Sequence, residues 1–468
     1  MALPDLIPII IYIILLIYLG IKSRRREADK SEFLLSGRNL SLPAFVATLV
    51  STWYGGILGV GEFVYHQGIS VWIVFGLPYY LFALLFAFFL APKIRLSDSY
   101  SIPEMLYRTY NKPIGALGSI FIIIMTSPAP YILMIGILLQ SILSINLFYS
   151  VLLGTFFSIV YVYWGGFRSV VRTDIFQFIL MFSGFIVLFL FLISSSIRVT
   201  TLPEHLDALH KNLTGGLSWQ EIVVWVLIAS WTFIDPGFHQ RCSAAKTPQI
   251  AKRGIYVSVG FWFLFDMLTL TCGLYAYILL PNINPMMSYP ELGNLILPPV
   301  LKGLFFTGLL ATIMSTVDSY TFLSALTFGN DILAQLKKTT PDADLNKYVK
   351  LGLIVTASIS IILIFLMPSV IRLWYNLGSL FIPPLIIPLL AVYFPKIKIP
   401  EIATLLIMII SFSVSLFCFL WGRLNMESGQ PSYPFGLEPF FPGLIATLGW
   451  YGIYNIKKLI RPKTGPED

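Results

Sequence analysis

The sequence predicts an all-α protein that crosses a membrane many times. Of its 468 residues, 57% are apolar and only 12% are charged, and the mean hydropathy is +0.81. A water-soluble domain of this length cannot bury so much apolar surface, so the lipid bilayer must be its solvent. The apolar residues also gather in runs of about 20, the length that a helix needs to cross the hydrocarbon core.

Thirteen such runs predict thirteen membrane-spanning helices in a polytopic protein. The first run is followed by basic residues and has no small-residue cleavage site, so we expect a retained helix rather than a signal peptide. No nucleotide-binding motif occurs in the sequence, which argues against an ATP-driven pump. The predicted helices are 5–22, 44–66, 71–92, 114–140, 147–164, 174–196, 219–238, 253–280, 300–329, 347–367, 371–394, 400–421 and 438–456.

Lys and Arg are distributed unevenly between the two sides of these helices. Of the 31 basic residues, 26 fall in connections or at helix ends on one side. We expect the protein in the plasma (cell inner) membrane. Because basic loops stay in the cytoplasm, we expect its N-terminus outside the cell and its C-terminus in the cytoplasm. The net charge of +8 therefore reports topology and not a nucleic-acid partner. The five basic residues on the outer side are Arg198, Lys211, Lys302, Arg372 and Arg423.

Cysteine and histidine give no sign of a transition-metal centre or of catalysis. Cys242, Cys272 and Cys418 are far apart, and the four histidines are scattered. This spacing favours neither a disulfide framework nor a metal site. Neither an HExxH motif nor a His/Asp/Ser constellation occurs, so we do not expect an enzyme.

One face of the predicted helix 300–329 carries a stripe of hydroxyl side chains with a carboxylate on its border. Oxygen ligands of this kind suit a small, hard cation such as Na⁺. The alternative for the hydroxyls alone is close helix packing or bonding to the carbonyl one turn back. Packing does not explain a buried carboxylate, because a charge at membrane depth is costly. The stripe consists of Thr312, Ser315, Thr316 and Ser319, with Asp318 beside it.

Two predicted helices contain residues that can interrupt them. Helix 44–66 includes Gly55, Gly56, Gly59 and Gly61, which favour either tight helix packing or a broken helix whose free carbonyls line a cavity. The sequence Asp-Pro-Gly at 235–237 indicates a second break.

Four further carboxylates fall within or at the ends of predicted spans. Asp174 opens the helix 174–196, where the helix dipole alone favours a carboxylate. Asp235 lies at the second break. For Glu62 and Asp266, a role in the transport path and a structural pairing are both open.

Five short motifs follow one another in the order seen in a known transporter family. With these residues the chain resembles the sodium:solute symporter family, whose members carry sugars, proline, pantothenate, sialic acid and iodide. The motifs are EFLLSGR at 32–38, SIPEML at 101–106, the Gly-Gly…Thr-Asp…Gln pattern at 165–177, the Pro…Gln-Arg…Ala-Ala-Lys pattern at 236–246, and MSTVDS at 314–319 followed by Asn-Asp at 330–331.

The resemblance implies a single transport domain with a five-plus-five inverted-repeat core and a discontinuous first core helix. It implies one domain over 1–468, with repeat one at 44–196, repeat two at 219–394, peripheral helices at 5–22 and 400–456, and a cytoplasmic tail at 457–468.

The resemblance also implies a sodium site. Its ligands would be the Thr312 carbonyl and the Ser315 and Thr316 hydroxyls, completed by two carbonyls three residues apart in helix 44–66. Counting back from Gly59 would select Leu49 and Thr52. Alignment of the aromatic-glycine run, which we favour, selects Ser51 and Tyr54. A second sodium ion would be held by Asp174, Ser315, Asp318 and Ser319.

The resemblance therefore implies sodium-coupled symport of a small organic solute by alternating access, in a chain that functions as a monomer. No Lys or Arg is expected at mid-membrane, so a neutral or cationic solute is favoured over an anionic one. One alternative is a proton-coupled carrier with Asp174 or Asp318 as the proton site, and another is a membrane sensor or channel. Candidate solute contacts, which could instead be ordinary core or lipid-facing side chains, are Trp53, Tyr54, Tyr79, Trp231 and Asp235.

Overall fold

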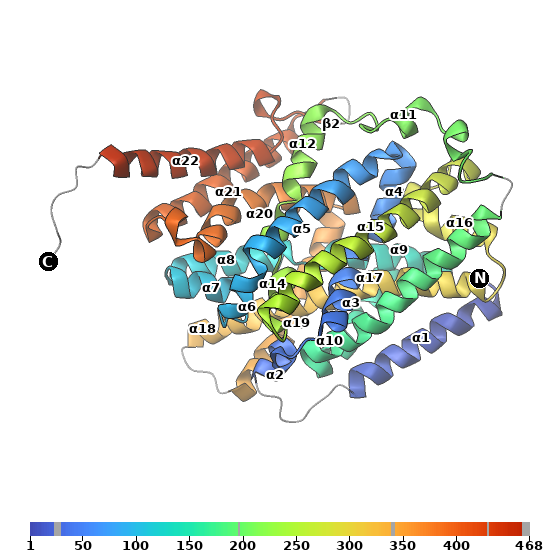
Figure 1. The fold of residues 1–468 in the computed structure, drawn as a ribbon, viewed down its shortest axis with the longest axis horizontal. Helices are drawn as coiled ribbons and strands as arrows, with labels where there is room; N and C mark the ends of the chain where they lie inside the picture. Colours follow the sequence, from blue (N-terminus) through green and yellow to red (C-terminus); the bar gives the residue numbers. More distant parts are fainter. Residues whose placement is uncertain (23–29, 195–196, 338–341, 428–429, 461–468) are drawn as a thin grey trace.

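The protein is a bundle of long helices in the computed structural model, which describes residues 1–22, 30–194, 197–337, 342–427 and 430–460 (Figure 1). Within these residues, eleven helical segments are long and apolar enough to cross a membrane. The predicted stretches 147–164 and 438–456 are helical as well. The basic segment 24–26 and the end of the C-terminal tail, 461–468, lie outside the described residues.

The long helices and the segments joined to them account for most of the chain. They are α1 (Leu3–Lys22), α3 (Leu42–Trp53), α4 (Ile57–Gln67), α5 (Leu77–Phe89), α8 (Lys112–Met125), α9 (Ala129–Leu143), α10 (Leu147–Ile193), α12 (Trp219–Ile228), α13 (Trp231–Ile234), α14 (Pro236–Ala244), α15 (Pro248–Leu279), α17 (Leu301–Leu326), α19 (Asp342–Leu366), α20 (Val370–Tyr393), α21 (Glu401–Leu424) and α22 (Phe440–Ile460).

Short elements connect these helices. They are α2 (Lys30–Leu35), α6 (Ala91–Leu96), α7 (Ile102–Thr109), α11 (Ala208–Lys211), α16 (Ser288–Ile296) and α18 (Ala334–Lys337), with a two-stranded antiparallel ribbon of β1 (Met426–Glu427) and β2 (Gln430–Pro431). Side-chain caps begin several helices. Ser218 and Glu221, for example, form a capping box at the start of α12.

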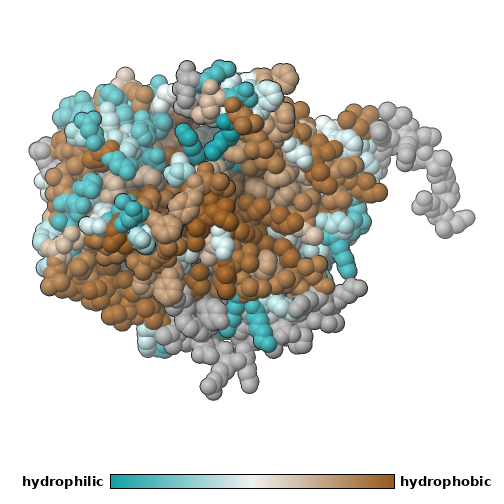
Figure 2. Space-filling view, turned by 180° about the vertical axis from the view of Figure 1, so that it is seen from behind, coloured by the Kyte–Doolittle hydropathy of each residue, from teal (hydrophilic) through white to brown (hydrophobic). Residues whose placement is uncertain are grey.

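Burial separates the central helix from the peripheral ones. All residues of α17 from Phe305 to Leu326 are buried, whereas α1, α5 and α15 expose large apolar side chains such as Ile14, Phe88 and Leu264. In the space-filling view, apolar side chains cover most of the middle of one face, and hydrophilic ones gather mainly toward its upper edge (Figure 2). An exposed apolar surface of this extent is what a bilayer would cover.

Both predicted helix breaks are present. Helix α3 ends at Trp53, a tight 3₁₀ turn spans Tyr54–Gly56, and α4 continues to Gln67. Asp235 has extended backbone angles between α13 and α14 and accepts a hydrogen bond from the Phe238 amide as the first residue before α14. A proline directly after it has no amide hydrogen, so the helix cannot run through this point unchanged.

Two boundaries differ from the prediction. The predicted helix 114–140 is divided into α8 and α9, because Pro128 cannot donate to the preceding turn. The predicted helices 147–164 and 174–196 lie within α10, which is divided by a kink at the non-helical Gly166 (φ 58°, ψ −163°), so the second helix begins near Gly166 and not at residue 174. Asp174 therefore does not open a helix, and the helix-dipole interpretation of this carboxylate is wrong.

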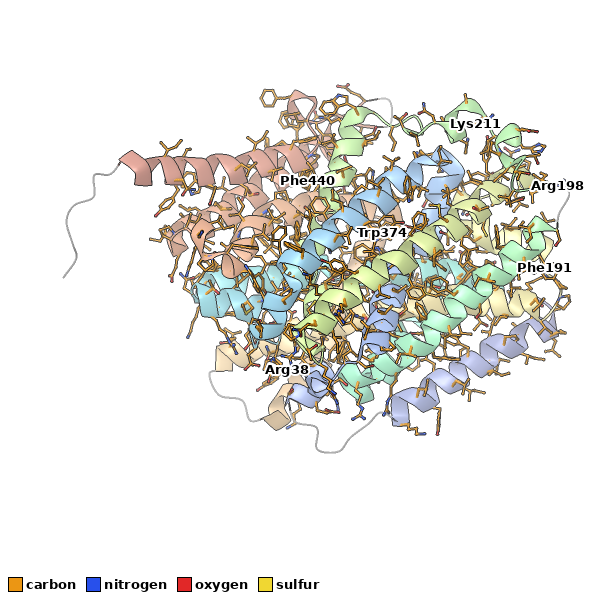
Figure 3. All side chains as sticks on the ribbon, viewed as in Figure 1. Arg38, Phe191, Arg198, Lys211, Trp374 and Phe440 are labelled. Atoms are coloured by element: carbon orange, nitrogen blue, oxygen red, sulfur yellow. The ribbon has the colours of Figure 1, made fainter. Side chains whose placement is uncertain are left out.

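Basic residues predicted for different sides of the membrane lie at opposite ends of the bundle. Arg38 is at one end, Arg198 and Lys211 are at the other, and Trp374 lies between them (Figure 3). In Figure 1, α21 and α22 flank the bundle on one side and α1 flanks it on the other.

Candidate functional site

The hydroxyl stripe of α17 meets the interrupted helix directly. The Thr316 hydroxyl donates to the Thr52 carbonyl at 2.6 Å, and the Ser315 hydroxyl lies 3.0 Å from the Ser51 hydroxyl. All four residues are buried. Gly55 permits this approach, because a Cβ at that position would overlap with the Thr316 side chain. The sequence predicted these two elements to converge, and they do.

The remaining predicted sodium ligands, Thr312 and Tyr54, both use their hydroxyls for hydrogen bonds elsewhere in the protein. The Thr312 hydroxyl is used within its own helix, where it donates to the Gly308 carbonyl at 2.7 Å, so only its carbonyl could serve an ion. The Tyr54 hydroxyl points away from α17 and donates to the Trp262 carbonyl and to Asp266. The carbonyl that contacts the stripe is that of Thr52, which belongs to the register counted back from Gly59.

Asp174 lies beside this contact and is fully buried. Its Oδ1 accepts from the Ser315 hydroxyl at 2.6 Å, and its Oδ2 accepts from the Thr48 hydroxyl. Asp318, predicted with it for a second ion, is also fully buried on α17. Gln177, three residues after Asp174 on α10, donates through its Nε2 to the Tyr12 hydroxyl of α1 at 3.0 Å. The peripheral helix α1 therefore closes this side of the charged centre.

A buried guanidinium at the same place was not expected from the sequence. Arg241 of α14 has no exposed side-chain surface. Its Nη2 donates to the Thr52 hydroxyl at 2.6 Å and to the Ser319 hydroxyl at 2.8 Å, and lies 3.4 Å from Asp174 Oδ2. The sequence places no Lys or Arg at mid-membrane, and Arg241 is not among the site residues that it predicts. The predicted helix 219–238 ends before position 241, whereas the observed span continues through the buried helix α14 to Ala244 and so includes Arg241.

A cavity of about 110 Å³ lies beside the turn Tyr54–Gly56. Four of the predicted solute contacts line it, namely Trp53, Tyr54, Tyr79 and Trp231. The other lining residues, whose separate positions in the sequence gave no local signal, are Gly56, Val60, Phe75, Tyr131, Ile228, Asp266, Tyr320 and Trp374.

The fifth predicted contact, Asp235, does not line the cavity but supports its wall. Its Oδ2 accepts from the Tyr320 hydroxyl at 2.7 Å and from Trp231 Nε1 at 3.2 Å. Of the two carboxylates with open roles, Asp266 faces the cavity and Glu62 does not.

Comparison with known proteins decides the family of the chain. A family model described as "Sodium:solute symporter family" matches residues 33–400. The chain belongs to this family. The predicted family and the predicted class of activity, sodium-coupled symport, are thereby confirmed.

Relatives of this symporter are distant but cover much of its length. It is 26% identical to the sodium/pantothenate symporter of Haemophilus influenzae, over 95% of this chain and 96% of the relative. Identity to the sodium/glucose cotransporter of Vibrio parahaemolyticus is 25%, over 74% and 72% of the two chains. The high-affinity choline transporter 1 of Drosophila melanogaster is 24% identical, over 79% of this chain and 63% of the relative.

Solved structures share the fold of this symporter. An outward-open, substrate-bound Na⁺-coupled sialic acid symporter aligns over 100% of both chains with a TM-score of 0.80 and 17% identity. A nucleobase-cation-symport-1 family transporter in a closed conformation aligns over 92% of this chain and 95% of its own, with a TM-score of 0.59 and 13% identity.

Proposed function

We propose that this symporter binds Na⁺ where the break after α3 meets α17, and that this ion drives uptake of a small organic solute by alternating access. The observation that carries the proposal is the 2.6 Å contact between the Thr316 hydroxyl and the Thr52 carbonyl. It joins the interrupted helix to the hydroxyl stripe through two oxygens, the ligand type that a hard cation requires.

The ligands of this ion would be the Thr52 and Thr312 carbonyls with the Ser315 and Thr316 hydroxyls. The contact at Thr52 supports the register that pairs it with the Leu49 carbonyl, over the one that uses the Ser51 and Tyr54 carbonyls. In that register Ser51 would not bind the ion through its carbonyl; its hydroxyl accepts a hydrogen bond from the Ser315 hydroxyl at 3.0 Å. An ion placed here would replace the direct contact of Thr316 with Thr52 by two ion–oxygen contacts.

Coupling would follow from the position of the break. The turn Tyr54–Gly56 belongs both to the segment that would hold Na⁺ and to the cavity wall. Ordering of this turn by Na⁺ would favour solute binding in the cavity, and the solute must then tighten Na⁺ binding by the same factor. Both would leave after the core opens to the cytoplasm.

A second ion would use Asp174, Ser315, Asp318 and Ser319. Arg241 already donates to Ser319 and lies near Asp174, so its guanidinium would have to move or share these oxygens. We therefore propose one resident ion at the main site and a second only with a displaced Arg241.

The number of spans, the repeat organisation, the oligomeric state and the orientation are proposed as the sequence analysis predicts them. We propose thirteen spans, a five-plus-five inverted-repeat core, a monomer, and insertion in the plasma membrane with the N-terminus outside. The separation of Arg38 from Arg198 and Lys211 supports this orientation (Figure 3).

The test of the sodium site needs no knowledge of the solute. Purified protein should melt at a higher temperature in NaCl than in KCl of equal ionic strength. Thr316→Val or Ser315→Ala should raise the Na⁺ concentration for half of this stabilisation about tenfold, equivalent to about 1.4 kcal/mol. Thr307→Val is the matched control, because Thr307 is buried on the same helix and bonds only to its own helix, at the Gly303 carbonyl.

Two results would refute the proposal. If the melting temperatures of both variants depended on Na⁺ as that of the wild-type protein does, Na⁺ would not bind at the proposed site. If the melting temperature were the same in NaCl and KCl, and transport were driven by a pH gradient alone, the protein would be a proton-coupled carrier.

A further inference from the structure

The chemistry of the cavity beside the helix break indicates which class of solute it accepts. Aromatic rings form most of its wall. Four rings from four different elements follow one another, with centroids 6.0 Å apart for Phe75 and Trp374, 6.3 Å for Trp374 and Tyr131, and 5.4 Å for Tyr131 and Tyr320. Trp53 and Tyr79 form a second ring pair at 5.2 Å.

The polar groups of several of these rings are already hydrogen-bonded to other protein groups. Tyr320 and Trp231 donate to Asp235, and Tyr54 donates to Asp266 and to the Trp262 carbonyl. These three side chains therefore offer a solute mainly their π surfaces. A sugar-like solute with many hydroxyls would lose hydrogen bonds to water, and the lining offers few replacements besides Asp266 and the Tyr79 and Tyr131 hydroxyls.

Asp266 is the single charged residue among the described residues that line the cavity. Its oxygens accept from the Tyr54 hydroxyl at 2.7 Å and from the Tyr80 hydroxyl. No Lys, Arg or His lies within ion-pair distance of it in the described part of the chain. Two hydroxyl donors solvate the carboxylate without supplying a positive charge, so a cation that enters the cavity would be its first counter-ion.

The buried guanidinium of Arg241 does not compensate the Asp266 carboxylate. Arg241 is directed to Thr48, Thr52, Asp174 and Ser319 and is absent from the cavity lining. An anionic solute would meet the Asp266 carboxylate without a compensating positive group. A cation would be attracted both by this carboxylate and by the ring faces.

We propose that the solute is a small organic cation, an alkylammonium whose positive head lies among these rings near Asp266. This inference rests on the proposed function, since it assigns the cavity to the solute. The volume of about 110 Å³ is smaller than the cavity of about 150 Å³ that accepts benzene in an engineered protein. The cavity therefore suits a small solute with few non-hydrogen atoms.

The decisive experiment compares probes that share a shape and differ in charge. Purified symporter in NaCl is titrated with (hydroxyethyl)trimethylammonium, with the neutral alcohol in which carbon replaces the quaternary nitrogen, and with pivalate, while the melting temperature is followed. We expect the cation to bind at least tenfold more tightly than its neutral isostere and pivalate to give no stabilisation. Equal binding of cation and isostere, preference for pivalate, or no stabilisation by the cation would overturn the inference.

Variants test the two recognition elements separately. Asp266→Asn should weaken cation binding at least tenfold, and Glu401→Gln, on the peripheral helix α21, should leave it unchanged. Tyr131→Leu should weaken cation binding while Tyr131→Phe, which keeps the ring, retains it. Loss of binding in Glu401→Gln to the same degree, or equal binding in all four variants, would also contradict the inference.

Sodium serves as the internal control for each of these measurements. A variant that keeps its Na⁺-dependent stabilisation is folded, so a lost response to the cation belongs to the cavity. Failure of Na⁺ to stabilise the wild-type protein would instead refute the proposed sodium site, and the two failures are thereby distinguished.

Discussion

Asp174 and Arg241 form the charged centre of the symporter, and both side chains are fully buried. The desolvation of two charges is expensive, and their mutual attraction repays it only when other hydrogen bonds complete the geometry. Here the hydroxyls of Thr48, Thr52 and Ser319 all lie within hydrogen-bond distance of one guanidinium nitrogen, Arg241 Nη2. The hydroxyl stripe thus serves a resident cation at one end, and we propose that it serves Na⁺ at the other.

A double-mutant cycle measures this coupling. Arg241→Gln leaves a buried carboxylate without its counter-ion and should cost about 3–5 kcal/mol of the free energy of unfolding. The double variant Asp174→Asn/Arg241→Gln should cost clearly less than the two single losses combined. Equilibrium unfolding in mixed detergent micelles provides the free energies.

The half-exposed pair Glu32 and Arg168 supplies the comparison. Their side chains are 24% and 29% exposed, so Arg168→Gln should cost only about 0–1 kcal/mol. If Arg241→Gln were as mild as Arg168→Gln, the buried pair would not be a stabilising unit.

At the scale of elements, two adjacent glycines let three helices meet. A Cβ at Gly55 would overlap with Thr316 of α17, and a Cβ at Gly56 would overlap with the indole of Trp374 in α20. Gly55 therefore belongs to the contact proposed for Na⁺, and Gly56 to the cavity wall. The sequence left tight packing and a helix break as alternatives for these glycines, and both are present.

Gly55→Ala should separate the Thr316 hydroxyl from the Thr52 carbonyl. We expect the variant to lose most of its Na⁺-dependent thermal stabilisation, because backbone atoms of the turn must move to admit the methyl group. Melting curves in NaCl and KCl measure this effect.

Gly260→Ala is the matched control for this substitution. Nothing lies within 4 Å of a Cβ at Gly260 in α15, so alanine there should be neutral or stabilising by up to about 1 kcal/mol. Wild-type Na⁺ stabilisation in Gly55→Ala would mean that the close approach of α3 and α17 is not required for the ion.

At the scale of the whole molecule, the central helix is the most buried and the outer helices are the most exposed. The central α17 is buried along most of its length, and α1 and α15 present apolar side chains outward. A bilayer replaces the missing protein neighbours of these outer helices, which is why a chain with so few charges can be stable.

The orientation of the bundle can be tested by cysteine labelling. Cys242, Cys272 and Cys418 are buried, so background labelling should be low. Asn212→Cys, in an exposed connection near Lys211, should react with a membrane-impermeant maleimide in intact cells. Lys396→Cys, exposed in the connection between α20 and α21, should react only after permeabilisation. The reverse pattern would place the N-terminus inside.

The sequence by itself determined the membrane class, the apolar stretches, the positions at which two helices could be interrupted, the hydroxyl stripe of α17 and the family. These features depend on composition, periodicity and short motifs, which are local properties of the chain. The meeting of Thr316 with the interrupted helix also followed from the sequence, through the resemblance to a family.

Only the tertiary structure decided how distant segments share the interior. It placed Arg241 beside Asp174, put the kink of α10 at Gly166, brought the Thr52 carbonyl to the Thr316 hydroxyl, and assembled the aromatic cavity around Asp266. Each of these depends on packing between elements far apart in the chain. Hydropathy records only whether a residue type tolerates lipid, and it does not specify which buried polar group will find which partner.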